Sequence, residues 1–304
     1  MKTRVLAVIV CMMAAVNFAS ADTIRGIGMD FVTIGNACNT ADTVVMNDGT
    51  TGYGAVGYNY RIGKYEVTNA QWNAFTAAAG APTGNDGWIW GDAYDQSAYW
   101  TGAQQPTNCV SWYEATQFCN YLTSGDKSKG VYQFSGNNTN PGNFLGINRD
   151  AAISSYGIAY VIPTENEWYK AAYYKPDSSG YSLYANGTNT PPSTSQACYG
   201  IYSSPWNIGV GTQEQNGTYD MMGNVCEWNE TLIGVAGGVM PIRGLRGGAH
   251  NYSYTMFPSS YRSTANAASF DFEDFGFRVA SVPEPATLLL FGLGGLALLR
   301  KPRV

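Results

Sequence analysis

Apolar residues recur at helical spacing in three segments of the chain, and the same polar signal precedes each segment. A hydroxyl residue followed three positions later by Glu or Gln fits the capping box, in which the two side chains satisfy orphan backbone donors reciprocally. The apolar periodicity after these boxes predicts three helices whose aromatic stripes belong to the core. The boxes are Thr68-Asn69-Ala70-Gln71, Ser111-Trp112-Tyr113-Glu114 and Thr164-Glu165-Asn166-Glu167.

Alternation of apolar and polar residues, the mark of a half-buried strand, is clearest from Val56 to Val67. Shorter candidates are Tyr160 to Ile162, Ile242 to Leu245 and Phe275 to Ala280. Long stretches rich in Gly, Asn, Ser and Thr separate the elements, at 81–108, 123–157 and 175–218. Loops of this length in a compact domain are usually functional or specially fixed. The pattern predicts a single, loop-rich α+β domain.

Residues 1–21 have the features of a secretory signal peptide. A basic start precedes an apolar run over 5–16, and Ala19-Ser20-Ala21 forms a small-residue cleavage site before Asp22. The run is shorter than the roughly 20 residues that a membrane span needs. The alternative is a buried N-terminal helix. The flanking residues favour the signal peptide, so we expect the domain to leave the cytoplasm.

The tail, residues 282–304, has three parts. Val282-Pro283-Glu284-Pro285 interrupts any preceding structure, because two prolines fix φ and remove donors. An uncharged apolar run over 287–299 and a basic end follow. This tail resembles the PEP-CTERM sorting signal. The resemblance implies recognition by an exosortase, removal of the tail, and delivery to the outer surface or extracellular matrix of a Gram-negative bacterium. A plain membrane anchor is the alternative; in both cases a short transmembrane segment holds the protein, at least transiently.

Charge narrows the range of partners. The two terminal segments hold five of the 17 basic residues and one of the 22 acidic residues, so residues 22–281 carry a net charge of about −9. Such a surface repels nucleic acid and anionic lipid headgroups, and no basic stripe offsets it. We therefore exclude nucleic-acid binding. The 36 glycines and 22 tyrosines fit a loop-rich domain in which aromatic rings supply much of the buried area.

Cysteine and histidine limit the chemistry further. Without Cys11 of the signal peptide, five cysteines remain: Cys38, Cys109, Cys119, Cys198 and Cys226. An oxidising compartment favours pairing, so one or two disulfides and a leftover thiol are expected, with the pairing left open. There is no CxxC pair and His250 is the single histidine, which argues against structural zinc, HExxH chemistry and a Ser-His-Asp triad.

Six motifs occur in one order between Phe31 and Ala280. They are GKYEVTN at 63–69, QPTNCVSW at 105–112, IPTENEW at 162–168, YDMMGNVCEW at 219–228, RGG at 246–248 and GFRV at 276–279. This order resembles the formylglycine-generating enzymes, also called sulfatase-modifying factors. The resemblance covers residues 22–281 almost completely and implies a complex C-type-lectin-like fold. The family activity would be a copper-dependent oxidation of a protein cysteine to formylglycine.

Charged residues stand inside these apolar motifs, where a charge is tolerated only if it is paired or hydrogen-bonded. We interpret them mainly as structural ion pairs rather than substrate contacts. The residues are Glu66, Glu167, Glu227, Arg246, Arg262 and Arg278.

The turn at 219–228 resembles a calcium site of the family. The resemblance implies one side-chain oxygen from Asp220 and backbone carbonyls near Met221, Gly223 and Val225. Oxygen ligands of this kind suit a hard cation such as Ca²⁺.

The chain departs from the family where the chemistry should lie. Active members carry RGGS followed by two copper-binding cysteines. Here Ala249 replaces the serine, and Tyr252 and Phe257 occupy the cysteine positions. A phenol and a benzene ring cannot replace two soft thiolates as Cu(I) ligands, so we expect neither copper nor catalytic residues.

Three functions remain open. The preferred one is a non-catalytic binding module, a pseudoenzyme, for a surface glycan or protein, with ligand candidates Ala249, His250, Asn251, Tyr252 and Trp228. The second is an oxidase of the family type whose altered site acts on protein cysteine. The third is a structural protein of an exopolysaccharide matrix.

Overall fold

The structure is a computed structural model that describes residues 20–87, 93–94, 97–264 and 266–283. Most of the predicted signal peptide and sorting tail lies outside these ranges. Within them, no helix is long and apolar enough to cross a membrane.

The three predicted helices are confirmed, each with its capping box. They are α1 (Asn69–Ala79), α2 (Trp112–Ser124) and α4 (Glu165–Tyr173). A fourth, α3 (Arg149–Tyr156), lies where a loop was expected. Its apolar pattern is weak, since only Ala152 and Ile153 are buried, and Asn148 caps it without a Glu or Gln partner.

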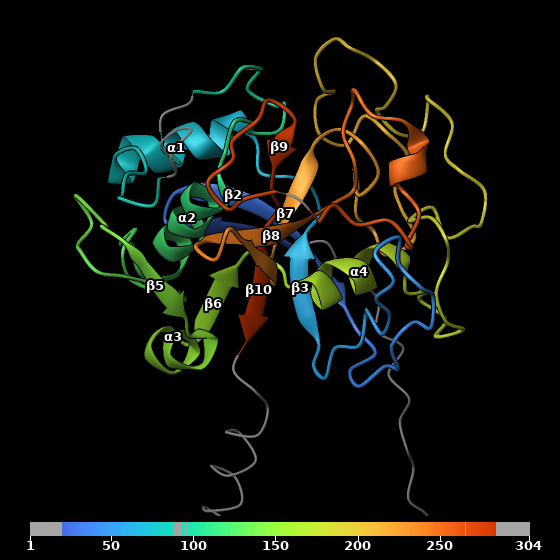
Figure 1. Cartoon of the computed structure of the whole chain (residues 1–304), viewed down its shortest axis with the longest axis horizontal. Coiled ribbons are helices and arrows are strands. Elements are labelled where there is room, and N and C mark those ends of the chain that lie inside the picture. The colour runs from blue at the N-terminus through green and yellow to red at the C-terminus, as the bar shows by residue number, and fades with distance from the viewer. Residues whose placement is uncertain (1–19, 88–92, 95–96, 265, 284–304) are drawn as a thin grey trace, which may run out of the picture.

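The main sheet joins the two ends of the domain. Its five strands are β1 (Ser20–Ile24), β2 (Ile27–Ile34), β3 (Tyr60–Gly63), β6 (Ile158–Val161) and β10 (Ala280–Pro283). They pair antiparallel in the order β1-β2-β3-β10-β6, so the last strand of the chain lies inside the sheet (Figure 1). Pro283 pairs with Ile158, so the first proline of the tail continues the strand that it was expected to interrupt.

A second sheet positions the motifs of the C-terminal half. β7 (Cys226–Ala236) pairs antiparallel with β8 (Met240–Arg246) and parallel with β9 (Phe275–Gly276). A two-stranded sheet of β4 (Tyr132–Phe134) and β5 (Phe144–Ile147) lies in a second stretch expected to be loop. The predicted strand at 56–67 shortens to β3, and the one at 275–280 divides into β9 and the start of β10.

An aromatic core lies against α2, of which every residue but the last is buried. The Phe118 ring of α2 meets Phe75 of α1 at 5.3 Å and Phe277 at 5.5 Å between centroids, both edge to face. Trp112, inside the second capping box, and Trp168, just after the third, are fully buried. The stripes predicted to be core are therefore core.

Candidate functional site

The RGG motif ends β8 and bends the chain toward the two positions that replace the family cysteines. Gly247 and Gly248 have φ of +92° and +69°, which favours glycine. A Cβ at Gly248 would come within 2.8 Å of the Phe257 ring, so the backbone and that ring pack directly.

Phe257 belongs to the core. Its side chain is fully buried, and its ring meets Tyr199 edge to face at 5.2 Å between centroids. Its backbone oxygen accepts a hydrogen bond of 2.9 Å from the Tyr173 hydroxyl. One of the two expected reactive positions is thus a packing position.

Tyr252 lines a pocket of about 160 Å³, together with Cys226, Gly248, Met256 and Phe275 among others. Burial, together with the acidic groups of Cys226 and Asp274 nearby, raises the pKa of the Tyr252 phenol. Tyr252 is therefore a neutral hydrogen-bond donor at neutral pH.

The pocket holds no ready thiolate. Cys226 is buried, and burial raises its thiol pKa well above 9.0. Burial also raises the pKa of Cys109 to about 11 and of Cys198 to about 12. Because the thiolate is the form that binds soft metals and attacks as a nucleophile, these side chains are inert as they stand.

The expected disulfides are absent from the part of the chain that the structure describes. All five cysteines there are free: Cys38, Cys109, Cys119, Cys198 and Cys226. Only Cys38 is exposed. Buried free cysteine behaves as a small apolar side chain, and its burial here removes the exposure on which oxidation depends.

Three of the five ligand candidates are corrected. The side chains of Ala249, His250 and Trp228 are covered by protein, so they cannot contact a ligand in this conformation. The Trp228 indole N–H donates to Val110 O at 2.8 Å, which is a structural role. Asn251 and Tyr252 are half-buried and remain candidates.

His250 is held inside the domain. Its ring Nδ1 lies 3.1 Å from the Asn224 backbone oxygen, and its ring meets Trp100 edge to face. Burial lowers its pKa below 6.5, so the neutral imidazole is favoured.

Five of the six charged residues singled out in the sequence form structural ion pairs, as predicted. Arg278 Nε lies 2.6 Å from Glu227 Oε2, and both side chains are fully buried. Arg149, which was not expected to take part, bridges Glu167 at 2.8 Å and Glu230 at 3.0 Å. Glu66 differs, because its carboxylate accepts hydrogen bonds from Asn224 Nδ2 and Val225 N.

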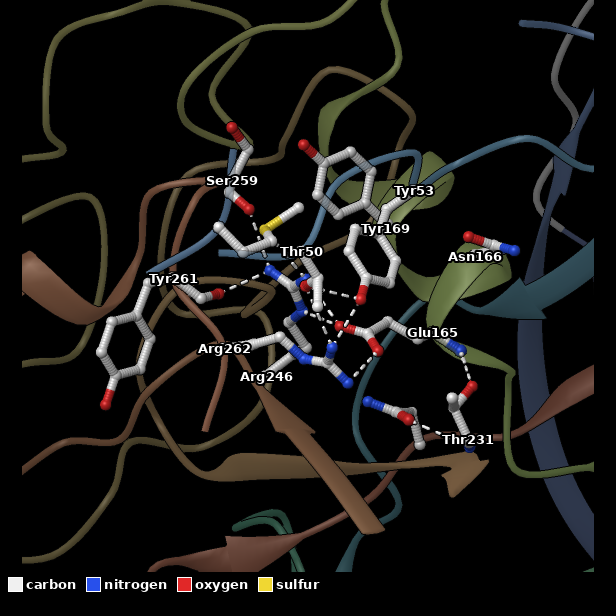
Figure 2. Close-up of polar contacts among 12 residues, drawn as sticks. Thr50, Tyr53, Glu165, Asn166, Tyr169, Thr231, Arg246, Ser259, Tyr261 and Arg262 are labelled. Carbon is white, nitrogen blue, oxygen red and sulfur yellow. Dashed lines mark hydrogen bonds and ion pairs between the residues drawn. The ribbon is translucent and has the colours of Figure 1, made fainter. Parts of the chain in front are cut away.

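Arg246 and Arg262 converge on one carboxylate, Glu165 of α4 (Figure 2). Arg246 Nη2 lies 2.6 Å from Glu165 Oε1, and Arg262 Nη2 lies 2.7 Å from Oε2. The Tyr53 ring lies over both guanidinium groups. Arg246 lines the pocket at Tyr252, and its guanidinium group is bonded to Glu165, so it fixes the loops around the pocket.

The turn predicted to hold calcium is tightly bent and acidic. Asp220, Gly223 and Asn224 all have positive φ, and Asp220 Oδ2 accepts a hydrogen bond of 2.8 Å from Gly209 N. Burial, against the opposing effects of Gly209 N and Arg278, raises the Asp220 pKa to about 6. In the described residues, no group of three or more His, Cys, Asp or Glu side chains forms a metal site.

A second and larger cleft, of about 500 Å³, was missed by the sequence reasoning. It lies between the β1–β2 hairpin and α1, and it shares no lining residue with the pocket at Tyr252. No local pattern marks it, since its walls come from residues 22–30, 65–74, 104 and 208.

Comparison with known proteins gives the geometry its context. The model of the sulfatase-modifying factor enzyme 1-like domain matches residues 32–282. The chain belongs to this family. The PEP-CTERM protein-sorting motif matches residues 281–304, so this sulfatase-modifying-factor-like domain carries a tail for export, exosortase processing and membrane-anchored sorting.

Relatives of the domain have varied names. This chain is 27% identical over 224 residues to the chaperone protein LppX of Paenibacillus barcinonensis, and the match covers 64% of this chain and 73% of that protein. The Treponema denticola variable protein 1 structure aligns with a TM-score of 0.59 and 21% identity over 88% of this chain and 99% of that one. The structure of PvdO from Pseudomonas aeruginosa aligns with a TM-score of 0.61 and 18% identity over 86% of this chain and 98% of that one. These structures establish the complex C-type-lectin-like α+β fold.

Proposed function

We propose that the exported domain is a non-catalytic binding module, a pseudoenzyme of its family. The observation that carries this proposal is which residues occupy the two family cysteine positions. Tyr252 presents a neutral phenol to a small pocket, and Phe257 is buried in the core against Gly248. Neither side chain can form the soft thiolate that suits Cu(I).

The loops around the pocket support a binding role. The segments 199–202 and 252–254 carry Tyr199, Tyr202 and Tyr254, and Tyr202 is 90% exposed. Exposed tyrosines provide large, rigid contact surfaces at low entropic cost. The partner is a surface glycan or protein at the outer surface or in the extracellular matrix. The name of the chaperone relative, LppX, is consistent with a family member that acts by binding a protein.

An oxidase assay tests the loss of catalysis. We expect purified residues 22–281, given copper, oxygen and a cysteine-bearing sulfatase peptide, to give no product above a blank with copper alone. Mass spectrometry of the peptide measures the conversion of cysteine to formylglycine, and a family member with both cysteines is the positive control. Turnover above the blank would favour the alternative of an oxidase with an altered site.

Binding is tested on the same preparation with a glycan array and a pull-down from cell surfaces. Saturable retention of one ligand is expected. If both experiments stay at background and the protein is abundant and polymer-associated in the matrix, the structural-protein alternative is supported instead.

Calcium at the turn of Asp220 is part of the proposal. Four buried carboxyl groups lie close enough to the Arg278 guanidinium for their charges to interact with it. They belong to Glu66, Glu214, Asp220 and Glu227. A Ca²⁺ ion held by Asp220 and the carbonyls of Met221, Gly223 and Val225 would favour the ionised form of the Asp220 carboxyl, whose pKa burial raises to about 6.

Ligand linkage gives the expected size of the calcium effect. Saturating Ca²⁺ at about 100 times its dissociation constant should stabilise the domain by about 2.7 kcal/mol. Thermal unfolding after chelation, with Ca²⁺ or Mg²⁺ added back, measures it, and Asp220→Asn should lose the response. An identical melting temperature in chelator and in millimolar Ca²⁺ would exclude the site.

A further inference from the structure

The cleft between the β1–β2 hairpin and α1 is the larger of the two cavities described above, and the function of the family does not account for it. Its volume of about 500 Å³ lies inside the range of about 300–1,000 Å³ that small-molecule sites occupy. Asp22 and Asp30 lie on the hairpin side, Ala74 lies on α1, and Gln104 and Ile208 close the remaining side. In Figure 1, α1 and β2 lie in neighbouring parts of the domain.

The lining is polar and holds no basic side chain. Carboxyl groups come from Asp22, Asp30 and Glu66, and amide and hydroxyl groups come from Gln71, Gln104, Thr23 and Thr68. Glu66 is buried, and its orientation is fixed by hydrogen bonds of 2.6 Å from Asn224 Nδ2 and 3.1 Å from Val225 N. Asp30 and Gln104 are exposed at the cleft.

Apolar surface in the cleft is limited. Tyr65 and Ile208 are half-buried and offer carbon atoms to the cavity, whereas Ile27 and Met29 are almost wholly covered. The Tyr65 ring is fixed against Tyr219, with 5.3 Å between centroids. A hydrophobic ligand would leave the polar groups of the walls without partners, which is costly.

We propose that this cleft binds a saccharide that carries no negative charge. The exposed side chains of Thr23, Asp30 and Gln104 offer acceptors and donors that match the hydroxyl groups of a sugar. Glu66, Thr68 and Gln71 are bonded within the protein and shape the wall of the cleft. Arg61 offsets the charge of Asp22, whereas Asp30 has no Lys or Arg beside it in the lining, so the Asp30 carboxylate repels uronate, sulfate and phosphate groups. The inference deepens the proposed function and rests on it, because it names a ligand class and a site for the binding module.

Processing leaves the site intact. Cleavage after Ala21 makes Asp22 the first residue, and every lining residue stays in the mature chain. Asp22 keeps its ion pair with Arg61, and the α-ammonium group that cleavage creates is on the same residue, away from Asp30 in sequence. The experiment therefore uses the mature chain, residues 22–281.

Calorimetry with three trisaccharides tests the proposal: N-acetylglucosamine trimer, glucosamine trimer and galacturonic acid trimer. We expect the neutral and the amino trimer to bind and the acidic trimer to be refused. Ala74→Trp fills the cleft and should weaken binding about tenfold or more, about 1.4 kcal/mol. Ala77→Trp is the matched control, since Ala77 is exposed on the same helix and does not line the cleft.

A charge variant gives independent evidence if the tryptophan disturbs α1. Asp30→Lys should weaken the amino trimer more than the neutral one, whereas Glu273→Lys, exposed and outside the lining, should affect neither. Equal affinity of wild type and Ala74→Trp overturns the location. Preference for the acidic trimer, or no binding of any trimer at millimolar concentration, overturns the ligand class. In the last case, a ligand still retained in the pull-down would leave the binding-module function standing.

Discussion

Replacing Arg278 by Met should lower the free energy of unfolding by about 3–5 kcal/mol, because it leaves the Glu227 carboxylate buried without its cation. The guanidinium also donates to Gly63 O and Tyr219 O, each at 3.0 Å, so it ties the main sheet to the turn of Asp220. Glu227 Oε2 accepts in addition from the Trp168 indole at 2.7 Å. Urea unfolding followed by fluorescence measures the change.

Lys129→Met is the control for this result. Lys129 forms an ion pair of 3.6 Å with Asp126, but its side chain is 66% exposed. Exposed pairs contribute about 0–1 kcal/mol, so the variant should unfold almost as the wild type does. If both variants lost the same stability, the buried pair would not be the anchor that its geometry indicates.

The second large effect is expected at Phe257. Phe257→Ala should cost about 3–5 kcal/mol, the usual range for removing a fully buried aromatic ring. The ring packs against Tyr199 and against the backbone of Gly248, so its loss opens a cavity beside the RGG turn. The same urea experiment measures it.

Tyr254→Ala, three residues earlier, is the matched comparison. Tyr254 is 43% exposed, and its removal should cost about 1 kcal/mol or less. A Phe257→Ala variant as stable as the wild type would contradict the core assignment. The expected result has a functional meaning, because a cysteine at 257 would also leave most of that cavity. In this chain, restoring the copper position costs stability.

Local rules predicted the helices well and the sheets poorly. Thr68, Ser111 and Thr164 bond to backbone groups three residues away, so a short sequence contains the whole capping signal. The partners of β10 are β3 and β6, more than 100 residues distant along the chain. Strand pairing at such distances leaves no local mark, which explains why the extension to Pro283 was missed. The β1–β2 hairpin is different, because its pairing is local and its buried positions Ile27, Met29 and Phe31 do alternate.

For the candidate site as well, some features could be predicted from the sequence and others depended on packing. The motif order located Tyr252 and Phe257 at the cysteine positions, and amino-acid chemistry alone removed the copper ligands. Packing then separated the two residues, one lining a pocket and the other in the core. It also covered Ala249, His250 and Trp228, which the sequence had indicated as ligand candidates.

By itself, the sequence determined the family, the sorting tail, the helix starts and the missing thiols at 252 and 257, because each depends on residue identity over a short stretch. Tertiary structure decided which side chains face solvent, that the five cysteines stay unpaired, and that a polar cleft opens between the β1–β2 hairpin and α1. Burial and cavities arise where distant segments pack together, and the free energy of that packing depends on all the segments in contact, so no single segment predicts it.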